Sequence, residues 1–122
     1  MKIRIKGNSV RYRLSKSEVA KFSEEGYLAE TTAFPSQILT YALEAKSNID
    51  NLSADFQVNK ITLFFPDSEK KIWYEGNRVG YKHSIDLPNG ESLSLLIEKD
   101  FACIDHTDED QSDNYDNPNL KC

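Results

Sequence analysis

The chain has 122 residues, a formal net charge of −5 and 39% hydrophobic residues, which suits one domain with a single core. Its longest strongly apolar run, residues 61–65, is far shorter than the ~20 residues that a membrane helix needs, so we expect no membrane contact and a cytoplasmic protein. Cys103 and Cys122 both lie near the C-terminal end, where they cannot staple the rest of the chain, and we expect them to be reduced.

The first half of the chain predicts four strands and one helix. Residues 2–6 and 10–14 alternate polar and apolar side chains around Gly7-Asn8-Ser9, which is typical of a β-hairpin. Ser15 and Glu18 have the spacing of a capping box, which predicts a short helix that ends near Gly26. Residues 27–34 and 38–43 then predict two further strands, separated at Pro35.

The second half repeats this order of elements. Strands are predicted at 54–58 and 61–65, a short helix follows from Asp67 to Gly76, and two strands at 79–87 and 93–97 close the series. Phe22 and Trp73 stand at matching positions in the two helices, although two amphipathic helices can also resemble each other by chance. We predict an α+β fold of about eight mostly antiparallel strands in a curved sheet or barrel with two short helices, built from pseudo-repeated ββαββ units at 1–46 and 54–99.

The charge is distributed unevenly along the chain. Residues 100–122 contain seven acids and one base, a net charge of −6, whereas residues 1–99 contain thirteen acids and fourteen bases, a net charge of +1. We therefore predict a near-neutral body at 1–99 and an acidic tail at 100–122 that packs on the body.

The first hairpin carries a cation at every second strand position. We interpret these side chains as an anion-binding face or as a docking face for the acidic tail, and a solvated face that protects the sheet edge is the alternative. Nucleic acid is disfavoured as a partner, because Tyr12 is the one aromatic residue in the hairpin and its parity points it away from the cations. The five cations are Lys2, Arg4, Lys6, Arg11 and Arg13.

Side chains that can bind metals concentrate in the tail. The spacing suits at most three soft ligands for zinc, Cys103, His106 and Cys122, supported by the carboxylates of Asp105, Asp108 and Asp110. An EF-hand is excluded because Asp113 stands where that loop needs glycine. The alternative is a solvated acidic tail in which Cys103 packs as a small apolar side chain. We expect no cofactor beyond such a divalent metal.

Two stretches of sequence and the last residue resemble a known family. KIRIKGNSVRYRLSKSEV, LIEKDFACIDHTDEDQSDNYDNP and the final Cys122 are similar to the ends of a family of small uncharacterised bacterial proteins, classed as a domain of unknown function. The family often has arginine where this chain has His106, and Phe-Pro-Asn-Pro where this chain has Tyr115-Asp116-Asn117-Pro118. The resemblance spans nearly the whole chain. It implies a bacterial, cytosolic origin and a tail that belongs to the domain. It gives no indication of an activity.

These observations favour a non-enzymatic binding or interaction module whose partner is a protein or an anionic small molecule. His83 stands on the apolar side of its strand and is predicted to be a core histidine rather than a catalytic base. The enzyme alternative is a metal-dependent phosphohydrolase or polyphosphate-binding enzyme with a charged barrel, by distant similarity to the triphosphate tunnel enzymes. This chain lacks the opening Glu-x-Glu-x-Lys motif of those enzymes. A metal-binding tail protein is the second alternative.

Overall fold

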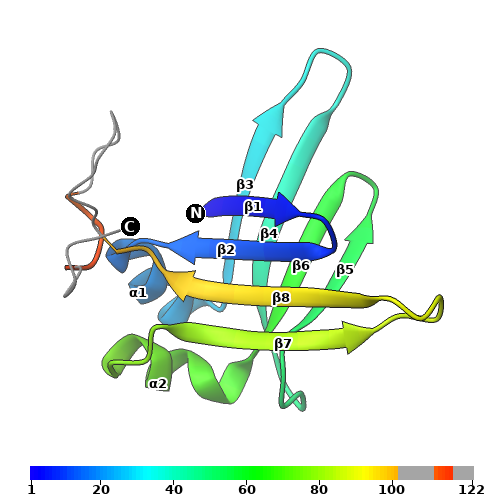
Figure 1. Ribbon diagram of the computed structural model, residues 1–122. Helices are drawn as coiled ribbons and strands as arrows, with labels where there is room; N and C mark the ends of the chain where they lie inside the picture. The colour runs from blue at the N-terminus through cyan, green and yellow to red at the C-terminus, as the bar shows by residue number, and fades with distance from the viewer. Residues whose placement is uncertain (102–111, 117–122) are drawn as a thin grey trace.

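The computed structural model describes residues 1–101 and 112–116 of the chain (Figure 1). Within these residues, eight strands and two short α-helices confirm the predicted α+β class. The elements are β1 Lys2–Lys6, β2 Ser9–Leu14, α1 Lys16–Glu25, β3 Tyr27–Ala33, β4 Ile38–Lys46, β5 Ser53–Gln57, β6 Lys60–Pro66, the 3-10 turn η1 Asp67–Glu69, α2 Lys70–Glu75, β7 Gly80–Asp86 and β8 Ser92–Lys99.

Helix α1 begins and ends where the sequence predicts. The backbone N–H of Ser15 donates to Glu18 Oε1 at 2.9 Å, which is half of the predicted capping box. At the other end, Gly26 adopts a φ of 71° and its N–H donates to the carbonyl of Phe22 at 2.8 Å. A side chain at this left-handed position would be strained, so glycine sets the end of the helix.

The strands form two four-stranded sheets. The sheet with the strand order β1-β2-β8-β7, here called the terminal sheet, joins the first and last hairpins of the body. The sheet with the order β3-β4-β6-β5, here called the middle sheet, joins the two hairpins between them. Figure 1 shows the strands of one sheet running across those of the other, with both helices at one end of the terminal sheet.

The eight mostly antiparallel strands are as predicted, but they form two separate sheets, and neither closes into a barrel. Strand β2 pairs with β8 in parallel and then passes into α1, so it never pairs with β3. Strands β1 and β7 therefore remain edges of the terminal sheet, and β3 and β5 remain edges of the middle sheet. Each of these four edge strands pairs with one neighbouring strand only, because neither sheet closes on itself.

Both sheets have the same connectivity. Each takes one hairpin from residues 1–46 and one from residues 53–99, and the hairpins meet through a parallel pair, β2 with β8 and β4 with β6. The two halves of the body thus exchange hairpins, and neither half forms a four-stranded sheet from its own strands. The division into pseudo-repeats at 1–46 and 54–99, and into a body and a tail, stays a prediction.

The core lies where the two sheets and the two helices meet. The ring of Phe65 on β6 lies 5.4 Å from Phe22 of α1, 5.4 Å from Trp73 of α2 and 4.8 Å from Tyr81 of β7. These centroid distances are those of favourable aromatic pairs. The largest fully buried side chains are Trp73, Tyr12, Phe22, Phe65, Leu14, Leu43, Leu63, Leu95, Ile97 and Val19.

The turn between β5 and β6 differs from the predicted strand. Val58 was expected on the apolar face of a strand, but it lies in the turn with a φ of 45° and is 94% exposed. Positive φ is strained for a β-branched residue, and the next residue, Asn59, with a φ of 62°, tolerates it better. The predicted strand at 54–58 is therefore confirmed as β5, but it ends at Gln57, one residue before Val58.

Replacing Phe65 with alanine is expected to lower the free energy of unfolding by about 3–5 kcal/mol, because the cavity removes ring contacts to both helices and to β7. Urea unfolding measures this loss. The matched control is Phe56→Ala, since Phe56 is 69% exposed and its loss should cost under about 1 kcal/mol. Equal losses in both variants would contradict the central place of Phe65.

Candidate functional site

The predicted cations gather on the outer face of the terminal sheet. In the β1–β2 pairing, Lys2 stands opposite Arg13, Arg4 opposite Arg11, and Lys6 opposite Ser9. Side chains alternate between the faces of a strand, so these residues point away from the core, while Tyr12 and Leu14 point into it. The register thus places five cations on one surface, here called the basic face.

Two cross-strand pairs of the basic face set like charges opposite each other. Cross-strand neighbours of the same sign destabilise a sheet, and here both Lys2–Arg13 and Arg4–Arg11 are of this kind. Glu98 on β8 offsets part of the charge, with its Oε1 3.7 Å from Arg11 Nη1 and 3.5 Å from Arg13 Nε. An excess of positive charge remains.

Arg11 occupies the least satisfied position on this face. Its side chain is 23% exposed, and its Nε is buried without a hydrogen-bond partner among the described residues. Burial lowers the pKa of Arg11, and the neighbouring Arg13 and Arg4 lower it further, against the opposing effect of Glu98. An anion bound beside Arg11 would therefore offset the repulsion from Arg13 and Arg4.

Two neighbouring depressions give an anion room on the basic face. One has a volume of about 270 Å³ and is lined by Arg4, Lys6, Ser9, Arg11 and Leu96. The other has a volume of about 280 Å³ and is lined by Lys2, Ile3, Arg4, Arg11 and Arg13. Arg4 and Arg11 line both, so this pair is the centre of the candidate site.

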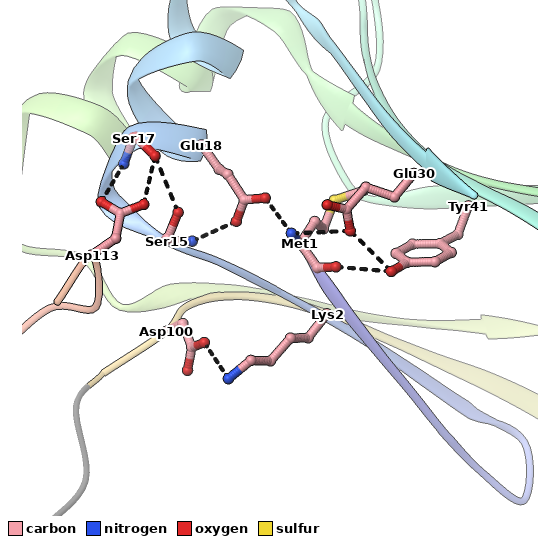
Figure 2. Close-up of polar contacts among 9 residues, drawn as sticks. All are labelled: Met1, Lys2, Ser15, Ser17, Glu18, Glu30, Tyr41, Asp100 and Asp113. Carbon is pink, nitrogen blue, oxygen red and sulfur yellow. Dashed lines mark hydrogen bonds and ion pairs between the residues drawn. The ribbon is translucent and has the colours of Figure 1, made fainter. Parts of the chain in front are cut away.

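The described part of the tail contacts the body, and Figure 2 shows two of these contacts. Asp100, whose side chain is 7% exposed, pairs with Lys2 through a contact of 2.8 Å between Oδ2 and Nζ. Further along, Asp113 accepts from the backbone N–H of Ser17 at 3.2 Å and from its hydroxyl at 2.5 Å, at the start of α1. Docking of the whole tail on the basic face stays a prediction.

Tyr115 holds the same part of the tail against the body. Its N–H donates to the carbonyl of Asp100 at 2.8 Å, and its ring lies 5.6 Å from that of Phe101. Lys99 Nζ lies 5.2 Å from the centre of the Tyr115 ring and donates to the carbonyl of Gly76 at 3.0 Å. Burial lowers the pKa of Lys99 and raises that of Tyr115 to about 12.

The α-amino group of Met1 forms a cluster that sequence patterns did not indicate. Figure 2 shows it between the carboxylates of Glu18 and Glu30, with Glu30 Oε2 at 3.1 Å. The hydroxyl of Tyr41 lies 3.0 Å from the carbonyl of Met1 and 2.9 Å from Glu30 Oε2. Burial, followed by the Glu30 hydrogen bond, raises the pKa of Tyr41 to about 12. These residues lie far apart in sequence, so no local motif could reveal the cluster.

The predicted metal ligands of the tail lie outside the described residues. They are Cys103, Asp105, His106, Asp108, Asp110 and Cys122. In the described ranges 1–101 and 112–116, no group of three His, Cys, Asp or Glu side chains is placed to hold a metal ion. His83 is half-buried on the inward side of β7, where it pairs with Leu95 of β8.

Replacing Asp113 with asparagine is expected to lower the free energy of unfolding at neutral pH. The hydroxyls of Ser15 and Ser17 hold the pKa of the Asp113 carboxyl below its ordinary value. A depressed pKa contributes stability above the unfolded-state pKa of ~3.9, and this contribution is lost as the pH falls through the lower folded-state pKa. Urea unfolding at a series of pH values should therefore show a gap between wild type and variant that closes in strong acid.

Asp116→Asn provides the matched control for Asp113→Asn, because Asp116 is an exposed aspartate of the same segment. It should leave the free energy of unfolding nearly unchanged at every pH. A gap for Asp113→Asn that persists undiminished in strong acid would contradict the assigned role of its carboxylate.

Comparison with known proteins relates residues 1–119 to one family. No curated protein and no solved structure matches the chain. Among the described residues, no helix is both long and apolar enough to cross a membrane. A family model described as a family of unknown function, DUF7009, matches residues 1–119. The chain therefore belongs to this family of unknown function, DUF7009.

Proposed function

We propose that this protein is a non-enzymatic interaction module that binds an acidic segment of a partner protein on the basic face. The observation that carries the proposal is the Arg4–Arg11 pair, in which two arginines stand opposite each other in the strand register and act on each other as like charges. Such an arrangement costs stability when the face is empty. Carboxylates placed over the pair would offset this repulsion.

The chemistry of arginine suits carboxylates as ligands. A guanidinium group offers a planar set of N–H donors that matches the two oxygens of a carboxylate. Arg4 and Arg11 line both depressions, with Lys6 beyond them in one direction and Lys2 and Arg13 in the other. The face can therefore receive several carboxylates in a row, as an acidic segment would present them.

The composition of the outer face favours a protein partner over nucleic acid. Single-stranded nucleic acids are bound by aromatic side chains beside the cations, and the register places no aromatic residue on the outer side of the described β1, β2 and β8. Glu98 and Asp100, which lie close to the cations, would also repel a continuous row of phosphates.

The phosphohydrolase alternative assumed a charged barrel, and neither sheet closes into one. The cations lie on the open face of a sheet rather than in a lumen. Its proposed metal ligands are in the tail, outside the described residues. The observed geometry supports binding on a surface.

A fluorescently labelled peptide of about ten glutamates tests the proposal by anisotropy. The wild-type protein should bind it with an affinity that falls as salt screens the charges. Arg11→Gln should weaken binding about tenfold, equivalent to ~1.4 kcal/mol, while the melting temperature stays unchanged or rises because the opposed like charges are relieved. Lys21→Gln, a change of an exposed cation on α1, should alter neither quantity.

Two results would overturn the proposal. One is equal affinity for the peptide in wild type, Arg11→Gln and Lys21→Gln, which would mean that net charge alone attracts it. The other is a lowered melting temperature of Arg11→Gln with unchanged affinity, which would make Arg11 a structural residue. Inorganic polyphosphate serves as a competing probe, and binding of polyphosphate alone would favour a phosphate ligand instead.

A further inference from the structure

A further polar cavity lies at the start of helix α2. It has a volume of about 190 Å³ and lies between the loop that follows β4, the turn η1 and strand β7. Its lining includes two acids and two bases, Asp50, Glu69, Arg78 and Lys82, together with Asn51 and Tyr81. We call this cavity the Glu69 pocket.

The four charged side chains of the Glu69 pocket form no ion pairs with one another. Among the described residues, the ion pairs of the protein join other groups, and none joins an acid of this pocket to one of its bases. Charges of opposite sign therefore line one small cavity without meeting across it. A ligand that carries both charges can bridge this gap.

Arg78 and Glu69 are both held in place by Tyr81. The guanidinium group of Arg78 lies 3.8 Å from the centre of the Tyr81 ring, and its Nε donates to the carbonyl of Gly80 at 3.0 Å. The hydroxyl of Tyr81 donates to Glu69 Oε1 at 2.8 Å. These contacts fix one cation and one carboxylate in a defined geometry before any ligand arrives.

The other half of the body shows what a carboxylate at this position can bind. Glu69 precedes Trp73 by the same spacing as Glu18 precedes Phe22, and both aromatic side chains lie in the core beside Phe65. Glu18 binds the α-ammonium group of Met1. Beside Glu69, the pocket is lined by the buried Leu52, and among the described residues no ion pair joins an ammonium group to Glu69.

We propose that the Glu69 pocket binds a free α-amino acid with a small side chain. Its ammonium group would lie at Glu69 and Asp50, as the ammonium of Met1 lies at Glu18 and Glu30, and its carboxylate would lie at Arg78 and Lys82. The volume is that of about six water molecules, and it falls below the range of pockets for drug-sized ligands. This site shares no lining residue with the two depressions of the basic face.

Three ligands of similar size test the proposal on the intact protein by NMR. Alanine carries both charges, ethylamine lacks the carboxylate, and propionate lacks the ammonium. Alanine is expected to shift the backbone amide signals around Glu69, Arg78 and Tyr81, with an affinity at least about tenfold above either single-charge analogue.

Variants locate the binding site. Glu69→Gln and Arg78→Gln should each abolish the shifts caused by alanine, while Glu75→Gln and Lys71→Gln, which change exposed charges on α2, should leave them intact. Signal dispersion in the same spectra reports whether each variant is folded. If Glu69→Gln or Arg78→Gln fails to fold, the comparison of alanine, ethylamine and propionate on the wild-type protein still tests the proposal.

The proposal is overturned if alanine shifts no signals near the Glu69 pocket at about 50 mM, or if ethylamine or propionate binds as well as alanine. Loss of alanine binding in Glu75→Gln as well as Glu69→Gln would also overturn it. The acidic peptide is tested separately, because the depressions at Arg4 and Arg11 share no lining residue with the Glu69 pocket.

Discussion

The structure depends on the packing around Phe65, because this one ring contacts a side chain from each helix and from the terminal sheet. It comes from β6 of the middle sheet and contacts Phe22 of α1, Trp73 of α2 and Tyr81 of β7. Two short helices could not be stable in isolation. Their shared contact with Phe65 stabilises both helices and holds them against the body.

This core determines where the charged groups of the protein can lie. Apart from His83 and Lys99, the inward positions of β1, β2, β7 and β8 are occupied by apolar side chains, and the cations of the first hairpin point outward. Tyr81 has its ring in the core and its hydroxyl on Glu69, which brings one edge of the core next to the Glu69 pocket. Both proposed sites are thus built on side chains whose positions the core sets.

The two sites differ in how much of each the sequence revealed. Alternation alone put Arg4 and Arg11 on one face, because neighbouring strands of a hairpin keep a simple register. The missing acceptor of Arg11 Nε depends on what packs around it and had no sequence signal. No sequence pattern indicated the Glu69 pocket, because its loop, turn and strand come together only in the folded structure, in which the two halves of the body exchange hairpins.

The sequence by itself determined the number, order and type of the elements, the capping of α1 and the outward direction of the first hairpin's cations. These are local properties, set by side-chain periodicity and by residues such as Ser15 and Gly26. Only the tertiary structure decided that β2 pairs with β8 and β4 with β6, which makes two open sheets rather than a barrel. Apolar strands can bury their inward faces against several partners, and the choice is made by how side chains such as Phe65 and Trp73 fill the space between them.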